Sequence, residues 1–517
     1  MTEQESKLTH PPKTWLWFSA GFTALAVALL FSGLVPVGVP GQWVIKQSIQ
    51  LSWEGLLVSL GAMGLIVLLM AAAWQKIESA RLGEEVAATA ALVLMLFMMQ
   101  FAVGSMSRFG SQESFIAITT RTTNVYFEES GTISEADPDG DSGLGAYLGK
   151  YARRSAESQY WQLKTHPPGP VIFFYGARLA AGVPAVRNAV LGGVRSLIPG
   201  EVYWRNNEEL SFLSLRLDDE AEAAGWLSLI ALRLAAALSV VPLYLLARKL
   251  GARRTALAAA ALAGLTPSLL LFNATIDQLY PLIGLAAVLI GWHAAVRRSM
   301  LLNVLCGIVL WIGLMFSVAF VVFALLICML QAWVLILKPP AGELRKNLPF
   351  LIRMTECMLI PSIVGFTVVA AAAGYGITAW LRCFKANSLF NQFEGRTYFA
   401  WLLANPPMFL SFLGLPAAAL LVRRVLAEGG RLLEERSPKA LDPLAVCTVA
   451  LLAALWLYGA NRGEVERLWM PLMPLCVLAG AGRIELDRTT ALALIGVQGA
   501  QAVLFKIGLD PLLGALT

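Results

Sequence analysis

The sequence predicts an all-α polytopic membrane protein with about thirteen transmembrane helices and a large first extracytoplasmic loop that carries juxtamembrane helices. Hydrophobic residues make up 57% of the 517 residues and charged residues only 14%, more apolar surface than a soluble domain needs. Mostly apolar runs of about eighteen or more residues recur along nearly the whole chain, and each can cross roughly 30 Å of hydrocarbon as a helix. Lys and Arg gather in turns between these runs.

The apolar runs define the predicted spans in order along the chain. The near-continuous stretch 301–337 is divided around Gly313 to Ser317, because the basic turns on both of its sides must share one compartment. The predicted spans are 15–34, 56–73, 86–105, 226–246, 256–272, 279–296, 301–318, 319–337, 351–377, 401–422, 444–458, 470–482 and 491–505.

Basic turns set the predicted orientation, because short cytoplasmic loops are enriched in Lys and Arg. We therefore place the amino terminus inside and the carboxyl terminus outside, in a plasma membrane of prokaryotic type. The net charge of +6 follows from this topology and predicts no nucleic-acid surface. The basic turns are Lys76/Arg81, Arg248-Lys249 with Arg253-Arg254, Arg297-Arg298, Lys338 to Lys346, Arg423-Arg424 with Arg431, and Arg483/Arg488.

Three regions follow from this topology. Residues 1–107 form an amino-terminal three-helix membrane segment, 108–222 an extracytoplasmic loop, and 223–517 the transmembrane helical core. The loop contains an apolar patch, 171–183, which we interpret as a short interfacial helix with Tyr175 and Arg178 at headgroup level. The six cysteines have neither CxxC nor Cys/His spacing, so neither a disulfide framework nor a zinc site is predicted.

One loop segment has the character of a reaction centre. It reads Lys164-Thr165-His166-Pro167-Pro168-Gly169-Pro170 and stands between a polar stretch and an apolar run. Stiff prolines that hold an ionisable side chain at a membrane surface indicate a functional position for His166, with Lys164 beside it. The structural alternative is that His166 only donates a hydrogen bond to a backbone carbonyl oxygen.

Several other polar residues are predicted to face the same compartment. Asp277 and Tyr280 stand at the end of a helical hairpin, and the late segment 461–469 carries Arg462, Glu464 and Arg467. Arg233 lies inside the end of its helix. A further loop holds Arg382, Lys385, Glu394 and Arg396.

Each of these residues also has a structural interpretation. Arg462 could pair with Glu466, and Glu464 with Arg467, to cap helix ends. Arg233 could extend toward lipid headgroups, and Asp277 could cap a helix after Thr275.

Basic groups, carboxylates and an apolar helix at one membrane surface suit a substrate with an anionic head and a hydrocarbon tail. A polyprenyl-phosphate sugar has this shape. The predicted reaction is an inverting displacement at the anomeric carbon by an acceptor hydroxyl, with a carboxylate as general base and cations that stabilise the departing lipid phosphate. The sequence contains no Walker or Rossmann fingerprint.

The chain resembles the GT-C glycosyltransferases, in the branch of the protein-mannosyltransferases and aminoarabinose transferases. The resemblance is strongest over roughly residues 110 to 320. It is carried by the proline motif 164–170, by the arginine-led helix 232–239 that leads to 246–251, by Leu265-Thr-Pro267 before Asp277, and later by 462–469.

The resemblance implies a polyprenyl-phosphate sugar donor, an extracytoplasmic acceptor (glycan, lipid or protein) and a catalytic carboxylate in the first large loop. His166 falls where the family carries Lys or His, and Asp277 falls near a second acidic position. The family's early Asp-Glu pair is replaced here by Thr122-Thr123-Asn124 before Tyr126. We favour Glu128 and Glu129 as its substitutes, with Glu113 behind them.

Two other functional classes remain open at this stage. A lipid or sugar transporter or flippase would line its path with the same charges, although no convincing internal repeat is present. A noncatalytic envelope scaffold would fit the missing loop aspartate. The sequence predicts no specific cofactor, and a divalent cation stays an open alternative.

Overall fold

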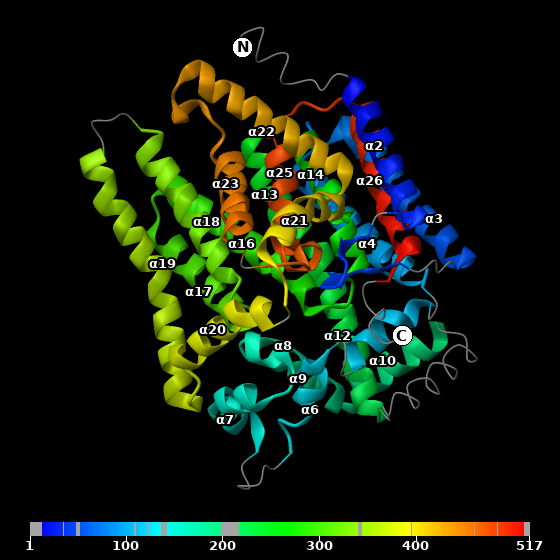
Figure 1. Cartoon of the computed structure of the whole chain (residues 1–517), viewed down its shortest axis with the longest axis vertical. Coiled ribbons are helices and arrows are strands. Elements are labelled where there is room, and N and C mark those ends of the chain that lie inside the picture. The colour runs from blue at the N-terminus through cyan, green and yellow to red at the C-terminus, as the bar shows by residue number, and fades with distance from the viewer. Residues whose placement is uncertain are drawn as a thin grey trace.

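The computed structural model describes residues 13–34, 36–47, 52–107, 110–120, 124–135, 142–197, 217–339, 344–393, 395–459, 461–482 and 484–510. It confirms an all-α polytopic membrane protein. Within these ranges seven helices are long and apolar enough to cross a bilayer, and two bent helix pairs raise the number to as many as nine. Figure 1 shows upright helices between α3 (Trp53–Lys76) and α19 (Leu344–Ala373), with several short helices at the lower end.

The amino-terminal segment begins with α2 (Lys13–Ser32), which packs against α26 (Arg488–Gly508). A small antiparallel hairpin follows, β1 (Gly38–Val39) with β2 (Trp43–Val44). Strand β3 (Lys46–Gln47) then pairs with β4 (Leu509–Asp510) near the carboxyl end. After α3, helix α4 (Leu82–Gly104) completes the segment.

Short helices follow α4 and gather at one end of the bundle, which we call the loop end (Figure 1). The apolar patch 171–183 forms helix α9 (Gly169–Gly182), and after a bend of 96° the chain continues as α10 (Pro184–Leu197). Arg178 is also turned inward, since its Nε donates to Ser130 Oγ at 2.9 Å. These elements are η1 (Gly110–Gln112), α5 (Glu113–Thr119), α6 (Val125–Gly131), α7 (Gly143–Glu157), α8 (Trp161–Thr165), α9 (Gly169–Gly182) and α10 (Pro184–Leu197).

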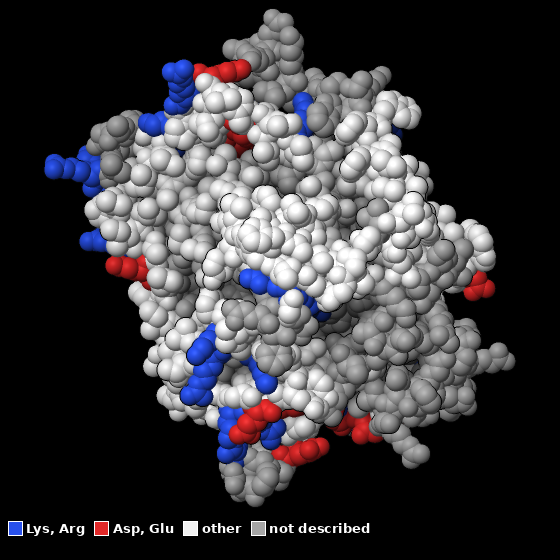
Figure 2. All heavy atoms as spheres, viewed as in Figure 1, with Lys and Arg blue, Asp and Glu red and all other residues white. Residues whose placement is uncertain are grey.

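The membrane core follows, and its first helix, α12 (Asp219–Leu238), packs against α9. Its elements are α12 (Asp219–Leu238), α13 (Val240–Leu250), α14 (Arg253–Gly264), α15 (Pro267–Leu271), η2 (Ile276–Leu279), α16 (Tyr280–Arg297), α17 (Met300–Phe316), α18 (Phe320–Ala332), η3 (Trp333–Leu337), α20 (Ile377–Phe393), α21 (Tyr398–Leu413), α22 (Leu415–Glu435), η5 (Pro438–Ala440), α23 (Pro443–Tyr458), α24 (Val465–Leu468), η6 (Met470–Leu472) and α25 (Met473–Ala481). On the face shown in Figure 2, a wide central area is mostly white, and most Lys, Arg, Asp and Glu lie around it.

Two predicted spans are broken. Span 256–272 ends as α14 at Gly264 and restarts as α15, because Pro267 has no N–H to donate and disfavours helical geometry at Thr266. Span 401–422 divides at Gly414, whose φ is +94°, and α21 and α22 meet there at 116°. A Cβ at Gly414 would lie 2.3 Å from the amide group of Gln498, so both the turn and the close approach require glycine.

These breaks explain much of the difference between thirteen predicted spans and the seven to nine helices that meet the length criterion. Four other predicted spans are apolar helices of only 10–17 residues. The segment predicted as a loop with Arg382, Lys385 and Arg396 is largely helix α20. Its fourth residue, Glu394, lies outside the described residues.

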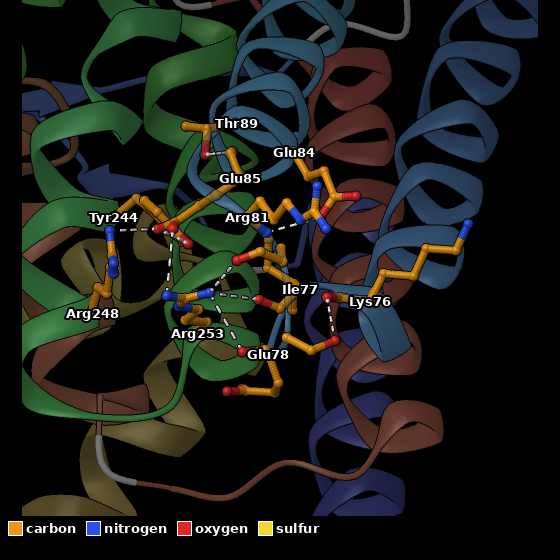
Figure 3. Close-up of polar contacts among 12 residues, drawn as sticks. Lys76, Ile77, Glu78, Arg81, Glu84, Glu85, Thr89, Tyr244, Arg248 and Arg253 are labelled. Carbon is orange, nitrogen blue, oxygen red and sulfur yellow. Dashed lines mark hydrogen bonds and ion pairs between the residues drawn. The ribbon is translucent and has the colours of Figure 1, made fainter.

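Several of the predicted basic turns come together at the other end of α4 (Figure 3). Glu85 is buried there, and its Oε1 accepts from Tyr244 Oη at 2.8 Å and lies 2.8 Å from Arg248 Nη1. Arg253 donates from Nη1 to the Ala80 carbonyl at 2.8 Å. The network joins α4, α13 and α14, so these predicted cytoplasmic turns share one end of the bundle.

A second buried ion pair joins the loop end to the last helix. Lys506 Nζ on α26 lies 2.8 and 2.9 Å from the two carboxylate oxygens of Glu113 on α5. Both side chains are almost fully buried. Glu113, which the sequence suggested as a reserve base, is therefore held in a structural pair.

We expect Lys506→Met to lower the thermal unfolding midpoint sharply, because it leaves the Glu113 carboxylate buried without its counter-charge, a loss of about 3–5 kcal/mol. Intrinsic tryptophan fluorescence of the detergent-solubilised protein measures the midpoint. The double variant Lys506→Met/Glu113→Gln should recover most of the loss. Equal midpoints for wild type and Lys506→Met would contradict a stabilising role for the pair.

Candidate functional site

A polar cavity of about 530 Å³ lies at the loop end of the bundle. Its walls come from segments that are far apart in the sequence: hairpin β1–β2, the region of α8, helix α20, and the turn that leads into α24. His166, Glu464 and Arg467 all line it. The structure thus brings the histidine-proline corner and the late arginine-glutamate turn into one site.

The turn before α24 has an unusual backbone. Gly463 and Glu464 have φ of +87° and +57°, in the left-handed region that a side chain disfavours. A Cβ at Gly463 would approach the Trp401 ring to 2.8 Å, so glycine is required there. The strain at Glu464 is on the order of 1–3 kcal/mol, and the ion pairs of its side chain offset it.

Glu464 joins two arginines across the cavity wall. Its Oε1 lies 2.7 Å from Arg396 Nη2, and its Oε2 lies 2.8 Å from Arg467 Nη2. Burial alone would raise the pKa of Glu464, but Arg467 and Arg396 outweigh burial and lower that pKa below its ordinary value. The carboxylate therefore stays ionised and holds both guanidinium groups in place.

Arg467 also reaches the predicted carboxylate Asp277. Its Nε lies 3.7 Å from Asp277 Oδ2, longer than its contact with Glu464. Burial by itself lowers the pKa of Arg467, whereas Glu464 and Asp277 raise it, and the result lies above the ordinary arginine value. The guanidinium is therefore permanently charged, with one tight and one loose carboxylate partner.

Two tyrosines, Tyr126 and Tyr280, lie near Asp277. Tyr280 begins α16 three residues after Asp277, and its ring packs edge-on against Phe320 at 5.6 Å. Burial, with the charge of Asp277 adding to it, raises the pKa of Tyr126 well above its usual value. Tyr126 Oη donates to the Gln162 carbonyl at 3.2 Å. The phenol therefore stays protonated beside the aspartate.

His166 lines the cavity as a neutral imidazole. Burial, and then the charge of Arg467, lower its pKa to about 4. Its Nδ1 lies 3.1 Å from the Gln162 carbonyl oxygen, which can only accept, so Nδ1 carries the proton and Nε2 has a free lone pair. The predicted carbonyl contact and the predicted cavity position are therefore both present.

Glu466 is a buried acid next to this network. Its side chain is 0% exposed, and neither carboxylate oxygen has a hydrogen-bond partner among the described residues. Burial raises the pKa of Glu466 to about 8, and Glu464 contributes in the same direction. The proposed pairing with Arg462 does not form, because Arg462 donates instead to the carbonyls of Gly459 and Arg396.

Other predicted site residues lie away from the cavity wall. Glu129 is 3.4 Å from Arg154 Nη1 on α7, and neither it nor its neighbour Glu128 is among the lining residues. Lys164 does not line the cavity either, and its Nζ lies over the Trp161 ring at 5.3 Å.

Arg233 is enclosed by protein and does not extend toward headgroups. It is 0% exposed, and its Nη2 donates to Ser114 Oγ at 2.8 Å and to Asn273 Oδ1 at 3.1 Å. Its guanidinium carbon also lies 4.1 Å from the centre of the Phe101 ring. These contacts join α12 to α4, to α5 and to the segment before η2, so Arg233 has a structural position in the bundle.

Sequence reasoning missed one wall of the cavity. Trp43 from hairpin β1–β2 and Asn387 and Phe390 from α20 all line it. The hairpin lies more than 350 residues from its partners: Gln42 Oε1 accepts from Thr397 N at 2.8 Å and from Trp401 Nε1 at 2.9 Å. Only the Trp43 position, between apolar runs, gave any local signal of an interface residue.

Comparison of the chain with protein-family models gave no match, and comparison with curated proteins gave none either. Within the described ranges, no group of three or more His, Cys, Asp or Glu residues is placed to hold a metal ion. The site must therefore be interpreted from its own geometry.

Glu466 makes a pH-dependent contribution to stability. Between its ordinary pKa of 4.5 and its raised value of about 8, the folded protein keeps a proton that the unfolded chain has released, so stability falls as pH rises. We expect Glu466→Gln to remove this loss, which is on the order of a few kcal/mol. The variant should melt near wild type at pH 4 and above it at pH 8.5.

Glu54→Gln, at an exposed position on α3, is the matched control and should keep the wild-type pH profile. Thermal unfolding followed by tryptophan fluorescence across this pH range measures all three proteins. Parallel profiles for wild type and Glu466→Gln would show that Glu466 is not a buried neutral acid.

Proposed function

We propose that this protein is a polyprenyl-phosphate-sugar-dependent glycosyltransferase that moves the sugar to an acceptor hydroxyl by an inverting displacement. The proposal is supported by two arginines and a neutral histidine that line one polar cavity of a membrane bundle, with Asp277 in loose contact with one of these arginines. A lipid-linked donor can present its head to such a cavity and leave its tail in the bilayer. Its sugar arrives already activated, so no nucleotide site is needed.

The arginines supply the phosphate site. Guanidinium groups bind phosphate oxygens through paired N–H donors, and Glu464 holds Arg396 and Arg467 with contacts of 2.7 and 2.8 Å. The two guanidinium groups would stabilise the developing charge of the leaving lipid phosphate. The neutral Nε2 of His166 adds an acceptor for a sugar hydroxyl.

Asp277 is the carboxylate best placed to act as the base. An arriving phosphate would compete for Arg467, and the 3.7 Å contact to Asp277 is weaker than the 2.8 Å contact to Glu464. Phosphate binding would therefore release Asp277 first. None of Asp277, Glu128 and Glu129 is among the lining residues, and Asp277 is favoured because it contacts Arg467, whereas Glu129 pairs with Arg154. Glu128 and Glu129 stay predictions of the family resemblance.

The proposed step balances without a further reactant. Asp277 takes the proton of the acceptor hydroxyl, while the oxygen of that hydroxyl forms a bond to the anomeric carbon. The bond from that carbon to the phosphate oxygen breaks, and its electron pair leaves with the lipid phosphate toward Arg467 and Arg396. Attack opposite the leaving group inverts the anomeric carbon.

The predicted topology places this chemistry on the extracytoplasmic side of a prokaryotic plasma membrane. The basic turns around Glu85 (Figure 3) lie at the start of α4, whereas the loop end follows its last residue, Gly104. If those turns are cytoplasmic, as the positive-inside rule predicts, the cavity opens outside, where a glycan, lipid or protein acceptor would be found.

We expect Asp277→Asn to reduce sugar transfer by roughly 10²–10⁴-fold, because the amide cannot take the acceptor proton. Transfer is measured with radiolabelled polyprenyl-phosphate sugars and purified protein in detergent or liposomes. Glu128→Gln and Glu129→Gln should stay within a few-fold of wild type. A large loss in either glutamine variant, with Asp277→Asn active, would move the base into the first loop.

The arginines give a second comparison within the same assay. Arg467→Met should abolish transfer, whereas Arg462→Met, five residues away and bonded to carbonyls, should retain most of it. No transfer by the wild type with any of several donors would contradict the enzyme and favour transport or a scaffold.

A further inference from the structure

A second cavity of about 250 Å³ lies beside α21 and is almost entirely apolar. Its walls come from α2, from residues 36–38, from α21, and from the end of α26. Among its lining side chains only Ser411 carries a polar atom. A cavity with this lining is suited to hydrocarbon and gives a polar ligand no partners.

The apolar cavity is next to the polar one along α21. Trp401, whose ring approaches Gly463 of the polar cavity, lies one helical turn, about 5 Å, before Ala404 of the apolar cavity. Hairpin β1–β2 also contributes to both, because Gly38 lines the apolar cavity and Trp43 lines the polar one.

The hairpin tip contacts the start of α21. Gln42 Nε2 donates to Thr397 Oγ1 at 2.9 Å, and Gln42 Oε1 accepts from Trp401 Nε1. The Trp43 and Trp401 rings lie 6.2 Å apart, and Arg396 stands 5.9 Å from the Trp43 ring. The hairpin therefore approaches the cationic wall through Trp43 and lines the apolar cavity through Gly38.

We propose that the apolar cavity holds the first part of the hydrocarbon chain of a lipid whose phosphate head binds at Arg396 and Arg467. The inference rests on the proposed function and adds the tail site to it. The charge complementarity of the arginines for phosphate, together with the shared hairpin and helix, selects a lipid phosphate as the occupant. Half of this tail site comes from the amino-terminal segment, so the resemblance over residues 110–320 does not supply it.

This placement gives the amino-terminal segment a role in binding. Helix α2 supplies Ala26, Leu29 and Leu30, and the hairpin tip would lie where the chain meets the phosphate. Donor length would then affect binding through α2 and α21, while the arginines would bind the head of any donor.

The test measures binding of two probes that share a phosphate head, undecaprenyl phosphate with a long polyprenyl chain and dimethylallyl phosphate with a single isoprene unit. Ala26→Phe fills the apolar cavity from α2, and we expect it to weaken binding of undecaprenyl phosphate about tenfold or more and of dimethylallyl phosphate less than twofold. Ala28→Phe, an exposed position on the same helix, is the matched control and should change neither.

Arg467→Met should weaken binding of both probes, which separates the head site from the tail site. If Ala26→Phe does not fold, Ala404→Phe fills the same cavity from α21. The tail site alone would be overturned if the wild type binds both probes and Ala26→Phe or Ala404→Phe binds them as the control does. It would also be overturned if either variant weakens binding of both probes equally. Failure of the wild type to bind either probe would contradict the proposed function as well.

Discussion

The site depends on one ion network that a left-handed turn positions. Gly463 allows the chain to turn tightly against Trp401, and Glu464 then points between Arg396 and Arg467. Without this carboxylate, two arginines would repel each other at a half-buried wall. With it, both guanidinium groups are held at fixed positions, and Arg467 keeps only a loose contact with Asp277. The network therefore holds both guanidinium groups in place, while the loose contact of Arg467 with Asp277 can give way to an anion.

Other parts of the fold serve to bring this network together. Arg396 follows α20, Asp277 precedes α16, and hairpin β1–β2 arrives from the amino-terminal segment. Buried ion pairs join other helices of the bundle: Glu85 links the start of α4 to α13 and α14, and Glu113 links α5 to α26. Such pairs are retained only when their geometry is good, because an unpaired buried charge is costly. The bundle thus fixes where segments distant in sequence meet.

The sequence predicted the membrane class and the meeting of His166 with the late arginine-glutamate turn, since apolar run length and charge placement carry those signals. It did not predict the sharp bend at Gly414, because an isolated glycine in an apolar run looks like any other helical glycine until Gln498 is packed against it. It assigned Arg233 to the site, although its partners Ser114 and Asn273 are set by tertiary packing. Trp43 depends on hydrogen bonds of the hairpin across more than 350 residues, which no local pattern encodes.

We propose that Arg467 and Arg396 form the phosphate site of a lipid-linked sugar donor. A cryo-electron microscopy map of the protein with bound undecaprenyl phosphate tests it most directly. We expect phosphate density within hydrogen-bond distance of Arg467, with Asp277 moved away from that guanidinium. Phosphate density at another surface, with the Arg467–Asp277 contact unchanged, would contradict it.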